Sequence, residues 1–255
     1  MLLAVDVGNT HTDLGVFKGE TLLARWSLST ERERTADEMG VAIRNLFALS
    51  GLDPAAIEAM AVACVVPPLA SILESVASRH LGIRPLLVEP GIRTGMPILV
   101  DNPHEVGADR IVNGVAAHAR FHDAVIVVDF GTATTFDAVS ARGEYLGGAI
   151  APGLGISARA LFEATAKLPR IDLRRPEKAI GKSTVHCMQS GIFFGYLGLV
   201  REILSRIREE MGDAPKVIAT GGMSPLLSPD LSAWVDALDP NLTLTGLRIV
   251  YELNR

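Results

Sequence analysis

The sequence contains one pattern twice, and this repeat constrains the fold more than any other feature. In the first half an apolar run ends in Asp6 and leads into a turn that contains Gly8. In the second half an apolar run ends in Asp129 and leads into a turn that contains Gly131. Apolar runs bounded by glycine-containing turns are typical of β-hairpins. Each of two similar halves is therefore expected to open with a hairpin.

The similarity of the two halves continues beyond the turns. Aligning them pairs Thr12 with Thr135. A second strand is expected at residues 13–17 and at residues 136–140, and each ends near a Gly-Glu pair that precedes a third strand. Two meanders of this kind predict two similar domains that face each other.

The rest of the sequence alternates between helical and strand patterns. Helices are expected at residues 36–50, 68–80, 109–121, 158–166, 184–211 and 242–253, and strands at residues 59–62, 86–88 and 216–219. A small-residue bend is expected at residues 147–153. This alternation indicates an α/β fold, and we predict two domains, residues 1–115 and residues 116–255.

Composition excludes several classes of protein. The 255 residues carry a formal net charge of −5 and lack the clustered Lys and Arg that a sequence-independent grip on nucleic acid requires. Cys64 and Cys187 form no CxxC pair, which argues against a zinc site or a disulfide framework. No apolar run is long enough for a membrane span or a signal peptide. We expect a cytoplasmic protein with no nucleic-acid or membrane partner.

The first turn has the chemistry of a phosphate site. Asp6 stands at a strand end, and Gly8 allows close backbone approach before the small polar residues Asn9 and Thr10. Backbone N–H groups and hydroxyls in such a turn can contact phosphate oxygens. The carboxylate can hold Mg²⁺ through water, because Mg²⁺ gives up its waters reluctantly. The alternative is an ordinary hairpin turn, and recurrence of the pattern favours the phosphate site.

The second turn offers a similar set of groups. Asp129 could bind a cation, and hydroxyl residues follow it, beginning with Thr132. Gly221 and Gly222 follow another expected strand and would permit flat approach to an adenine or a ribose. A glycine pair after a strand is common, so this motif alone is weak.

A separate acid lies between the two turns in the sequence. Asp109 stands at an expected helix start, within the run from Gly107 to Arg110. Acids at this position often serve only as partners of the helix dipole. The functional alternative makes Asp109 a general base for an attacking hydroxyl, with Arg110 binding an anionic group.

Together these motifs resemble one family, the type III pantothenate kinases. The motifs that carry the resemblance are Asp6–Thr10, Val65–Pro67, Asn102–Pro103, Glu105–Arg110, Asp129–Thr135, Gly181 with Thr184, and Thr220–Gly222. They spread over nearly the whole chain. The resemblance implies two ribonuclease-H-like domains with a cleft between them, the actin-like ATPase fold of the acetate and sugar kinase, heat-shock and actin superfamily. It also implies a homodimer that uses ATP to convert pantothenate to 4′-phosphopantothenate, the first step of coenzyme A biosynthesis.

The resemblance assigns roles to individual residues. The residues implied to bind ATP are Asp6, Val7, Gly8, Asn9, Thr10, His11, Thr12, Asp13, Thr132, Gly221 and Gly222. Those implied to bind pantothenate are Val100, Gly107, Ala108, Asp109, Arg110 and Thr184. Asp109 would accept the proton, Asp129 would bind K⁺ or NH₄⁺, and Asp6 would hold Mg²⁺ through water. Val100 stands where the family usually has a tyrosine that lines the pantothenate pocket.

Other functions remain open from the sequence. One alternative is a non-catalytic transcriptional regulator of the same fold, and another is a superfamily kinase that acts on a sugar-like alcohol. Residues 153–158 also match a dinucleotide-binding fingerprint, with Asp172 near the expected acid position. That fingerprint requires a strand directly before its first glycine, and Ala151-Pro152 is expected to break this context.

Overall fold

The computed structural model describes residues 1–212 and 214–255, which divide into two compact units. The first unit comprises residues 1–97, 101–116 and 242–255. The second unit comprises residues 98–100 and 117–241. The chain passes from the first to the second unit within helix α3, Ala108–Phe121. The predicted domain boundary, with residues 1–115 in one domain and residues 116–255 in the other, stays a prediction.

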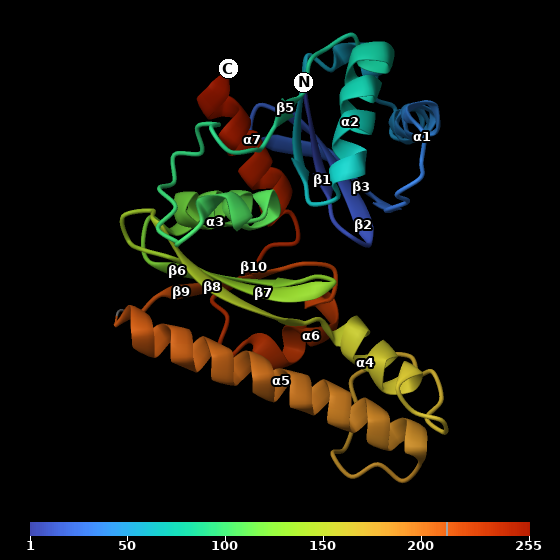
Figure 1. The fold of residues 1–255 in the computed structure, drawn as a ribbon, viewed down its shortest axis with the longest axis vertical. Helices are drawn as coiled ribbons and strands as arrows, with labels where there is room; N and C mark the ends of the chain where they lie inside the picture. The colour runs from blue at the N-terminus through green and yellow to red at the C-terminus, as the bar shows by residue number, and fades with distance from the viewer. Residues whose placement is uncertain (213) are drawn as a thin grey trace. The chain divides into compact units, whose positions relative to one another are not determined.

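The first unit is built on a five-stranded sheet with the order β3-β2-β1-β4-β5 (Figure 1). Its strands are β1 Leu2–Val7, β2 His11–Lys18, β3 Thr21–Ser29, β4 Ala59–Cys64 and β5 Leu86–Leu87. Its main helices are α1 Ala36–Leu49, α2 Pro67–Val76 and α7 Leu242–Asn254, and a short π-helical turn, Ala77–Leu81, follows α2. The first three strands are antiparallel, whereas β4 and β5 run parallel to β1.

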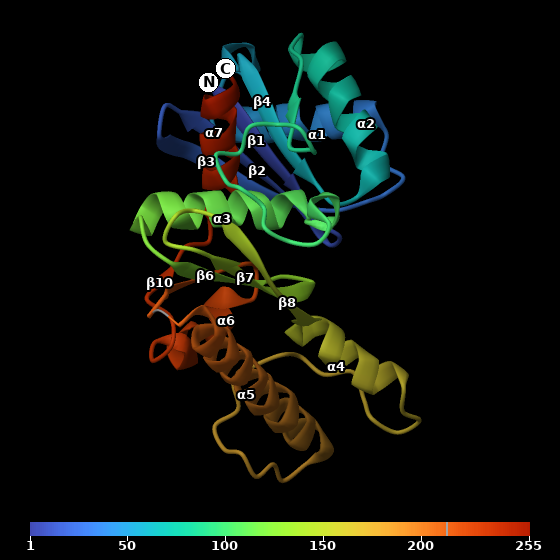
Figure 2. The ribbon, with the colours of Figure 1, turned by 60° about the vertical axis from the view of Figure 1, so that its left-hand side comes forward.

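The central strand of this sheet is buried on both faces. Leu3, Val5 and Val7 share one face by the two-residue period of a strand, and they join the apolar core that α1 and α2 form over it. Helix α7 packs on β1, β2 and β4, on the opposite side of the sheet from α1 and α2 (Figure 2). Near-continuous apolar sequence in β1 is therefore explained by burial on both sides.

The second unit repeats this plan. Its sheet has the order β10-β9-β6-β7-β8, which matches the first sheet strand for strand when read from the other edge. The strands are β6 Val125–Phe130, β7 Ala133–Val139, β8 Tyr145–Pro152, β9 Lys216–Thr220 and β10 Ala237–Leu238. The helices are α4 Leu154–Glu163, α5 Thr184–Met211 and α6 Ser224–Leu231. Two sheets that each open with a meander and continue with parallel strands confirm the expected α/β, ribonuclease-H-like fold.

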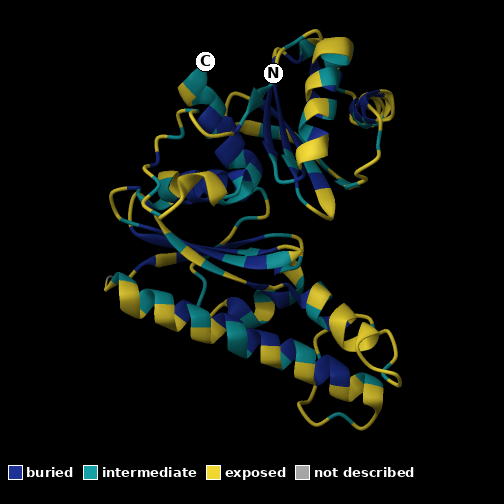
Figure 3. Cartoon of the chain, viewed as in Figure 1, coloured by how far each residue is buried: buried dark blue, intermediate teal, exposed yellow. Residues whose placement is uncertain are grey.

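Burial in the second unit concentrates in the central strands. Strands β6 and β7 are almost entirely buried, whereas the edge strand β8 is mostly intermediate or exposed. Helix α5 carries exposed residues along its length (Figure 3). Ile126, Val128 and Phe130 of β6 pack with residues of α4, α5 and α6 in one core. The core thus fixes the carboxyl end of β6, where Asp129 lies.

The expected bend at residues 147–153 is wrong, because strand β8 runs through it to Pro152. The glycines serve strand packing instead. A Cβ atom at Gly148 would lie 1.7 Å from the carbonyl oxygen of Phe136 on the neighbouring strand. Gly147 has a φ of 115°, a conformation that side chains other than glycine rarely adopt. The helix expected at residues 158–166 also begins earlier, at Leu154, whereas the helix at residues 184–211 is confirmed.

Candidate active site

The first hairpin joins β1 to β2 at the carboxyl end of β1. Asp6 pairs with Asp13 across the hairpin, and the Gly8 N–H donates to the carbonyl oxygen of His11 at 2.9 Å. A Cβ atom at Gly8 would lie 3.2 Å from the same oxygen, so glycine suits this tight turn. Asn9 and Thr10 are exposed at its tip. The turn thus presents backbone and small polar groups outward from a buried strand.

The Asp6 carboxylate lies close to the end of the neighbouring strand β4. Burial raises the pKa of the Cys64 thiol, and the negative charge of Asp6 adds to this effect. Cys64 pairs with Val7 in the sheet, one residue beyond Asp6. Asp6 is partly buried, so its charge sits in a site with limited solvent.

The second hairpin joins β6 to β7 and is tighter than the first. Asp129 pairs with Thr135, six residues later, whereas Asp6 pairs with Asp13, seven residues later. The sequence alignment of Thr12 with Thr135 is therefore wrong in register by one position. Thr12 pairs with Val7, the residue after Asp6, and Thr134 pairs with Phe130, the residue after Asp129. Thr12 therefore corresponds to Thr134.

The two corresponding threonines are both fully buried, and each is held by a second hydroxyl. Thr12 Oγ1 lies 3.0 Å from Thr30 Oγ1, and Thr134 Oγ1 forms a short hydrogen bond with the Tyr196 hydroxyl. Burial raises the pKa of Tyr196 to about 12, and the Asp129 charge contributes to the rise. Tyr196 is therefore neutral under physiological conditions and acts as a hydrogen-bonding group beside the hairpin.

Parallel pairing of β6 with β9 brings the glycine pair to the second hairpin. Asp129 pairs with Thr220, and the next residue, Gly221, has a φ of 90°. A Cβ atom at Gly221 would lie 2.4 Å from Asp129 Oδ1 and 2.6 Å from the backbone of Phe130. Glycine at this position is thus required for the strand end to pass over the carboxylate. Gly222 has open space around it.

The candidate base begins helix α3 in the first unit. Asp109 Oδ1 accepts a hydrogen bond from the Arg110 N–H at 2.8 Å, and a Cβ atom at Gly107 would lie 2.4 Å from the same oxygen. Desolvation raises the pKa of Asp109, while the Arg110 N–H and guanidinium act in the opposite direction. A raised pKa moves a carboxyl toward the range in which general bases are effective.

Val65 links this acid to the first hairpin within the first unit. Its N–H donates to the Val7 carbonyl oxygen at 3.0 Å. Its Cγ1 atom lies 3.6 Å from the position that a Cβ atom of Gly107 would take. Gly107 therefore lies against Val65, which is hydrogen-bonded to the end of the strand that carries Asp6.

The remaining predicted pantothenate residues lie in the second unit. Val100 packs near Gly147, with its Cγ1 atom 3.6 Å from a Cβ position there. Thr184 is the exposed first residue of α5, and Ser183 caps this helix by accepting from the His186 N–H at 3.3 Å. Val100 thus lies against strand β8, and Thr184 lies at the start of helix α5.

Sequence reasoning missed residues that support the hairpins. Thr30 and Tyr196 hold the buried threonines, and a hydroxyl at the end of β3 was the available signal for Thr30. Gly153 was assigned to the expected bend and to the dinucleotide fingerprint, and no role at the second hairpin was expected for it. Its N–H donates to the Thr132 carbonyl oxygen at 3.2 Å, and a Cβ atom there would lie 2.3 Å from that oxygen. Gly153 therefore closes over the second hairpin.

The expectation that Ala151-Pro152 breaks the strand before Gly153 is wrong. Ala151-Pro152 does not break the strand, since β8 ends at Pro152, directly before Gly153 caps α4. What separates this arrangement from a dinucleotide-binding unit is that β8 pairs antiparallel with β7, at the edge of the sheet. The fingerprint belongs to a parallel βαβ unit.

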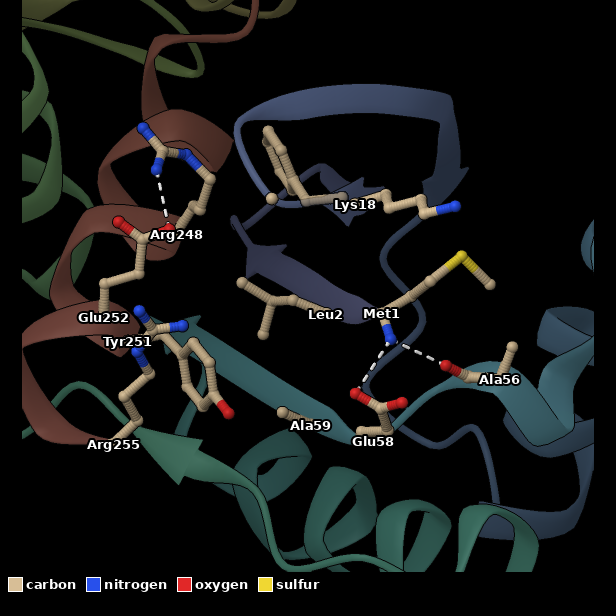
Figure 4. Close-up of a pocket in the computed structure, with 12 residues that line it drawn as sticks. Met1, Leu2, Lys18, Ala56, Glu58, Ala59, Arg248, Tyr251, Glu252 and Arg255 are labelled. Carbon is tan, nitrogen blue, oxygen red and sulfur yellow. Dashed lines mark hydrogen bonds and ion pairs between the residues drawn. The ribbon is translucent and has the colours of Figure 1, made fainter.

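A cavity of about 580 Å³ lies at the other end of β1 (Figure 4). Its lining includes Leu2 at the start of β1 and Arg248 of α7, whose guanidinium donates to Glu252 at 2.8 Å. None of the predicted site residues lines it. In the part of the chain that the structure describes, no helix has the length and apolar character to cross a membrane.

Comparison with known proteins identifies the family. A family profile described as type III pantothenate kinase matches residues 2–206. A type III pantothenate kinase of Geobacter sulfurreducens is 54% identical over 255 residues, and one of an Anaeromyxobacter species is 55% identical, with all of both chains covered in each case. A solved inorganic polyphosphate/ATP-glucomannokinase from an Arthrobacter species shares the fold, with a TM-score of 0.51, 15% identity and coverage of 100% and 99%. The chain therefore belongs to the type III pantothenate kinase family.

Proposed function

We propose that the chain transfers the γ-phosphoryl group of ATP to the hydroxyl of pantothenate and forms 4′-phosphopantothenate. Membership of the family makes the chain an ATP-dependent phosphotransferase. The observation that carries the proposal for the residues is the repeated hairpin with an acid at its strand end. Phosphate binding explains why Gly8 and Gly131 each follow such an acid by two residues.

The first hairpin, residues 6–13, binds the ATP phosphates through backbone N–H groups and the side chains at its tip. Thr132 contacts the phosphates from the second hairpin, and Gly221 with Gly222 accommodates the nucleoside. Phosphoryl transfer proceeds through a loose transition state with charge on the equatorial oxygens. Positioning and hydrogen-bond donation are therefore the main contributions of these turns to catalysis.

Asp109 is the proton acceptor. Its carboxylate takes the proton from the pantothenate hydroxyl as the oxygen attacks the γ-phosphorus and the bond to ADP breaks. The raised pKa of Asp109 supports this role, because a stronger base accepts the proton more readily. Arg110 binds the pantothenate carboxylate, with Gly107, Ala108, Val100 and Thr184 completing the substrate contacts.

Two cations are proposed beside the nucleotide. Among the described residues no group of three His, Cys, Asp or Glu side chains comes together. Asp6 would therefore hold Mg²⁺ as one carboxylate with water and phosphate oxygens, an arrangement that suits this ion. Asp129, whose carboxylate Oδ1 lies beside Gly221 at the end of β6, would hold the monovalent cation, K⁺ or NH₄⁺. These ions would neutralise phosphate charge.

We propose a homodimer that acts in the cytoplasm. Exposed apolar side chains on β8 and α4 support self-association, since large exposed apolar surfaces often mark interfaces. They are Leu146, Ile150, Ile156, Leu161 and Phe162. The relatives at 54% and 55% identity are type III pantothenate kinases, which favours pantothenate phosphorylation over a regulatory role or a sugar acceptor.

An acceptor panel tests the proposal. The chain is incubated with MgATP and K⁺, and ADP release is followed by a coupled assay with pantothenate, glucose, N-acetylglucosamine or no acceptor. Pantothenate alone is expected to raise ADP release above the rate without acceptor, with a product heavier by one phosphoryl group in mass spectrometry. Stimulation by a sugar and none by pantothenate would overturn the proposed acceptor.

A further inference from the structure

The segment that leads from β3 to α1 packs against the first hairpin. The Thr30 hydroxyl donates to the Gly8 carbonyl oxygen at 2.8 Å, and the Thr30 N–H donates to the Thr10 carbonyl oxygen at 2.9 Å. The buried Thr12 hydroxyl lies 3.0 Å from Thr30 Oγ1. Thr30 therefore contacts three positions of one turn and fixes the start of the segment against it.

The other end of the segment is fixed as well. The Arg34 N–H donates to the Glu31 carbonyl oxygen at 3.2 Å, which closes a four-residue turn, and the Arg34 guanidinium lies 2.8 Å from the Glu31 carboxylate. Thr35 and Glu38 then form a capping box at the start of α1. Arg32 is the second residue of a turn whose two ends are both held.

This turn directs Arg32 to the tip of the first hairpin. Arg32 Nη2 lies 3.4 Å from Asn9 Oδ1, and both side chains are exposed. A guanidinium carries five N–H donors and favours anionic oxygens that it can bind in a bidentate manner. The nearby Glu31 carboxylate is already paired with Arg34. The contact of Arg32 with the Asn9 amide is long and uses one N–H group. The other N–H groups of the guanidinium can donate to an anion bound on the hairpin.

We propose that Arg32 is a nucleotide-binding residue whose guanidinium contacts the β- or γ-phosphate oxygens of ATP held on the first hairpin. The proposal rests on the proposed function, because it takes the hairpin as the phosphate site. Asn9 positions the guanidinium beside the turn, and Thr30 holds the turn in register with Arg32. The charge of Arg32 then stabilises the phosphate tail where the hairpin presents its backbone N–H groups.

Binding of nucleotides to Arg32→Gln tests the proposal by calorimetry. The matched control is Arg79→Gln, which removes the same charge from an exposed arginine of the same unit that pairs with Asp37 at 3.0 Å. Arg32→Gln is expected to weaken MgATP binding about tenfold to hundredfold, as for loss of a charged hydrogen bond. AMP binding should change less than twofold, since AMP lacks both phosphates. Arg79→Gln should bind both nucleotides like the unmodified chain.

Three further measurements distinguish a failure of the Arg32 proposal from a failure of the proposed function. Arg32→Lys keeps the charge but loses the planar fork, so its MgATP affinity should fall between those of the unmodified chain and Arg32→Gln. Added salt should weaken MgATP binding to the unmodified chain more than to Arg32→Gln. MgATP affinity of Arg32→Gln within twofold of the unmodified chain would make Arg32 an ordinary surface arginine. If the unmodified chain binds MgATP but does not phosphorylate pantothenate, the proposed acceptor is refuted. The loss of MgATP affinity in Arg32→Gln would still show that Arg32 binds the nucleotide.

Discussion

Asp109 combines two properties at the scale of a single residue. Its carboxylate is held by the Arg110 N–H, which fixes its orientation, and it lies in a poorly solvated position that raises its pKa. The first property suits a group that must meet a substrate hydroxyl in one geometry. The second makes it a better proton acceptor than an exposed aspartate.

The pH dependence of the reaction should report this raised pKa. An ordinary aspartate has a pKa of about 3.9. Because the pKa of Asp109 is raised, the residue keeps its proton to higher pH, and the active carboxylate is lost sooner as the pH falls. We expect kcat/KM for pantothenate to decline on the acid side with a midpoint above the pKa of an ordinary aspartate. Circular dichroism at each pH would show that the fold persists, and a midpoint at or below that ordinary pKa would contradict the assignment.

At the scale of elements, each hairpin depends on one buried threonine. Thr12 and Thr134 hold equivalent register positions, and each finds its hydroxyl partner on a different kind of element, the end of β3 for Thr12 and helix α5 for Thr134. Burial of a hydroxyl without a partner is costly. The helix and the strand end therefore stabilise the turns that carry the acids.

Tyr196→Phe should destabilise the second unit by about 1–3 kcal/mol, because it leaves the buried Thr134 hydroxyl without the Tyr196 hydroxyl. Tyr251→Phe is the matched control, since Tyr251 is a partly exposed tyrosine at the cavity of Figure 4. Urea unfolding measures both, and the control should stay within about 0.5 kcal/mol of the unmodified chain. Equal stability of Tyr196→Phe and the unmodified chain would show that the hydroxyl pair contributes nothing.

The elements also show what the sequence could and could not predict. The bounds predicted for helix α5, Thr184–Met211, match the structure, where Ser183 caps the start and Gly212 follows the end in a left-handed conformation. Strand β8 was missed because its glycines have the composition of a bend, although they permit close strand approach. The register of the second hairpin was shifted because its loop is one residue shorter, which an alignment without a gap cannot show.

Only part of the candidate site can be proposed from local sequence patterns. Acids and glycines at strand ends are local signals, and Asp6, Asp129 and Gly221 were proposed from them. Thr30, Arg32 and Tyr196 reach the hairpins through tertiary contacts, and their positions follow from pairing and packing. Such tertiary contacts are not predicted by the local sequence around these residues.

At the scale of the whole molecule, β8 and α4 expose several apolar side chains that the proposed homodimer would cover. Ile150 is 65% exposed in the middle of a strand that also exposes Leu146. Apolar side chains in such a position are favourable when a second surface covers them. The proposed homodimer would supply that surface.

Ile150→Asp tests this surface. Light scattering after size-exclusion chromatography should give a dimer mass for the unmodified chain and a lower mass for the variant, because dimer formation would bury an unpaired carboxylate. Turnover with pantothenate should fall together with the mass. Leu49→Asp, at an 84% exposed position on α1, is the control and should leave both unchanged. A stable dimer of Ile150→Asp would move the interface elsewhere.

The central claim is that this chain phosphorylates pantothenate with Asp109 as the base, and the steady-state rate of Asp109→Asn tests it most directly. Turnover is expected to fall about 10²–10⁴-fold, as for loss of a general base, while calorimetry shows MgATP affinity unchanged. The raised pKa means that the folded state binds the Asp109 proton more tightly than the unfolded state does. Ionised Asp109 is thus destabilising above that pKa, so Asn should not lower the melting temperature at neutral pH. A folded variant that binds MgATP and turns over pantothenate at the original rate would contradict the account.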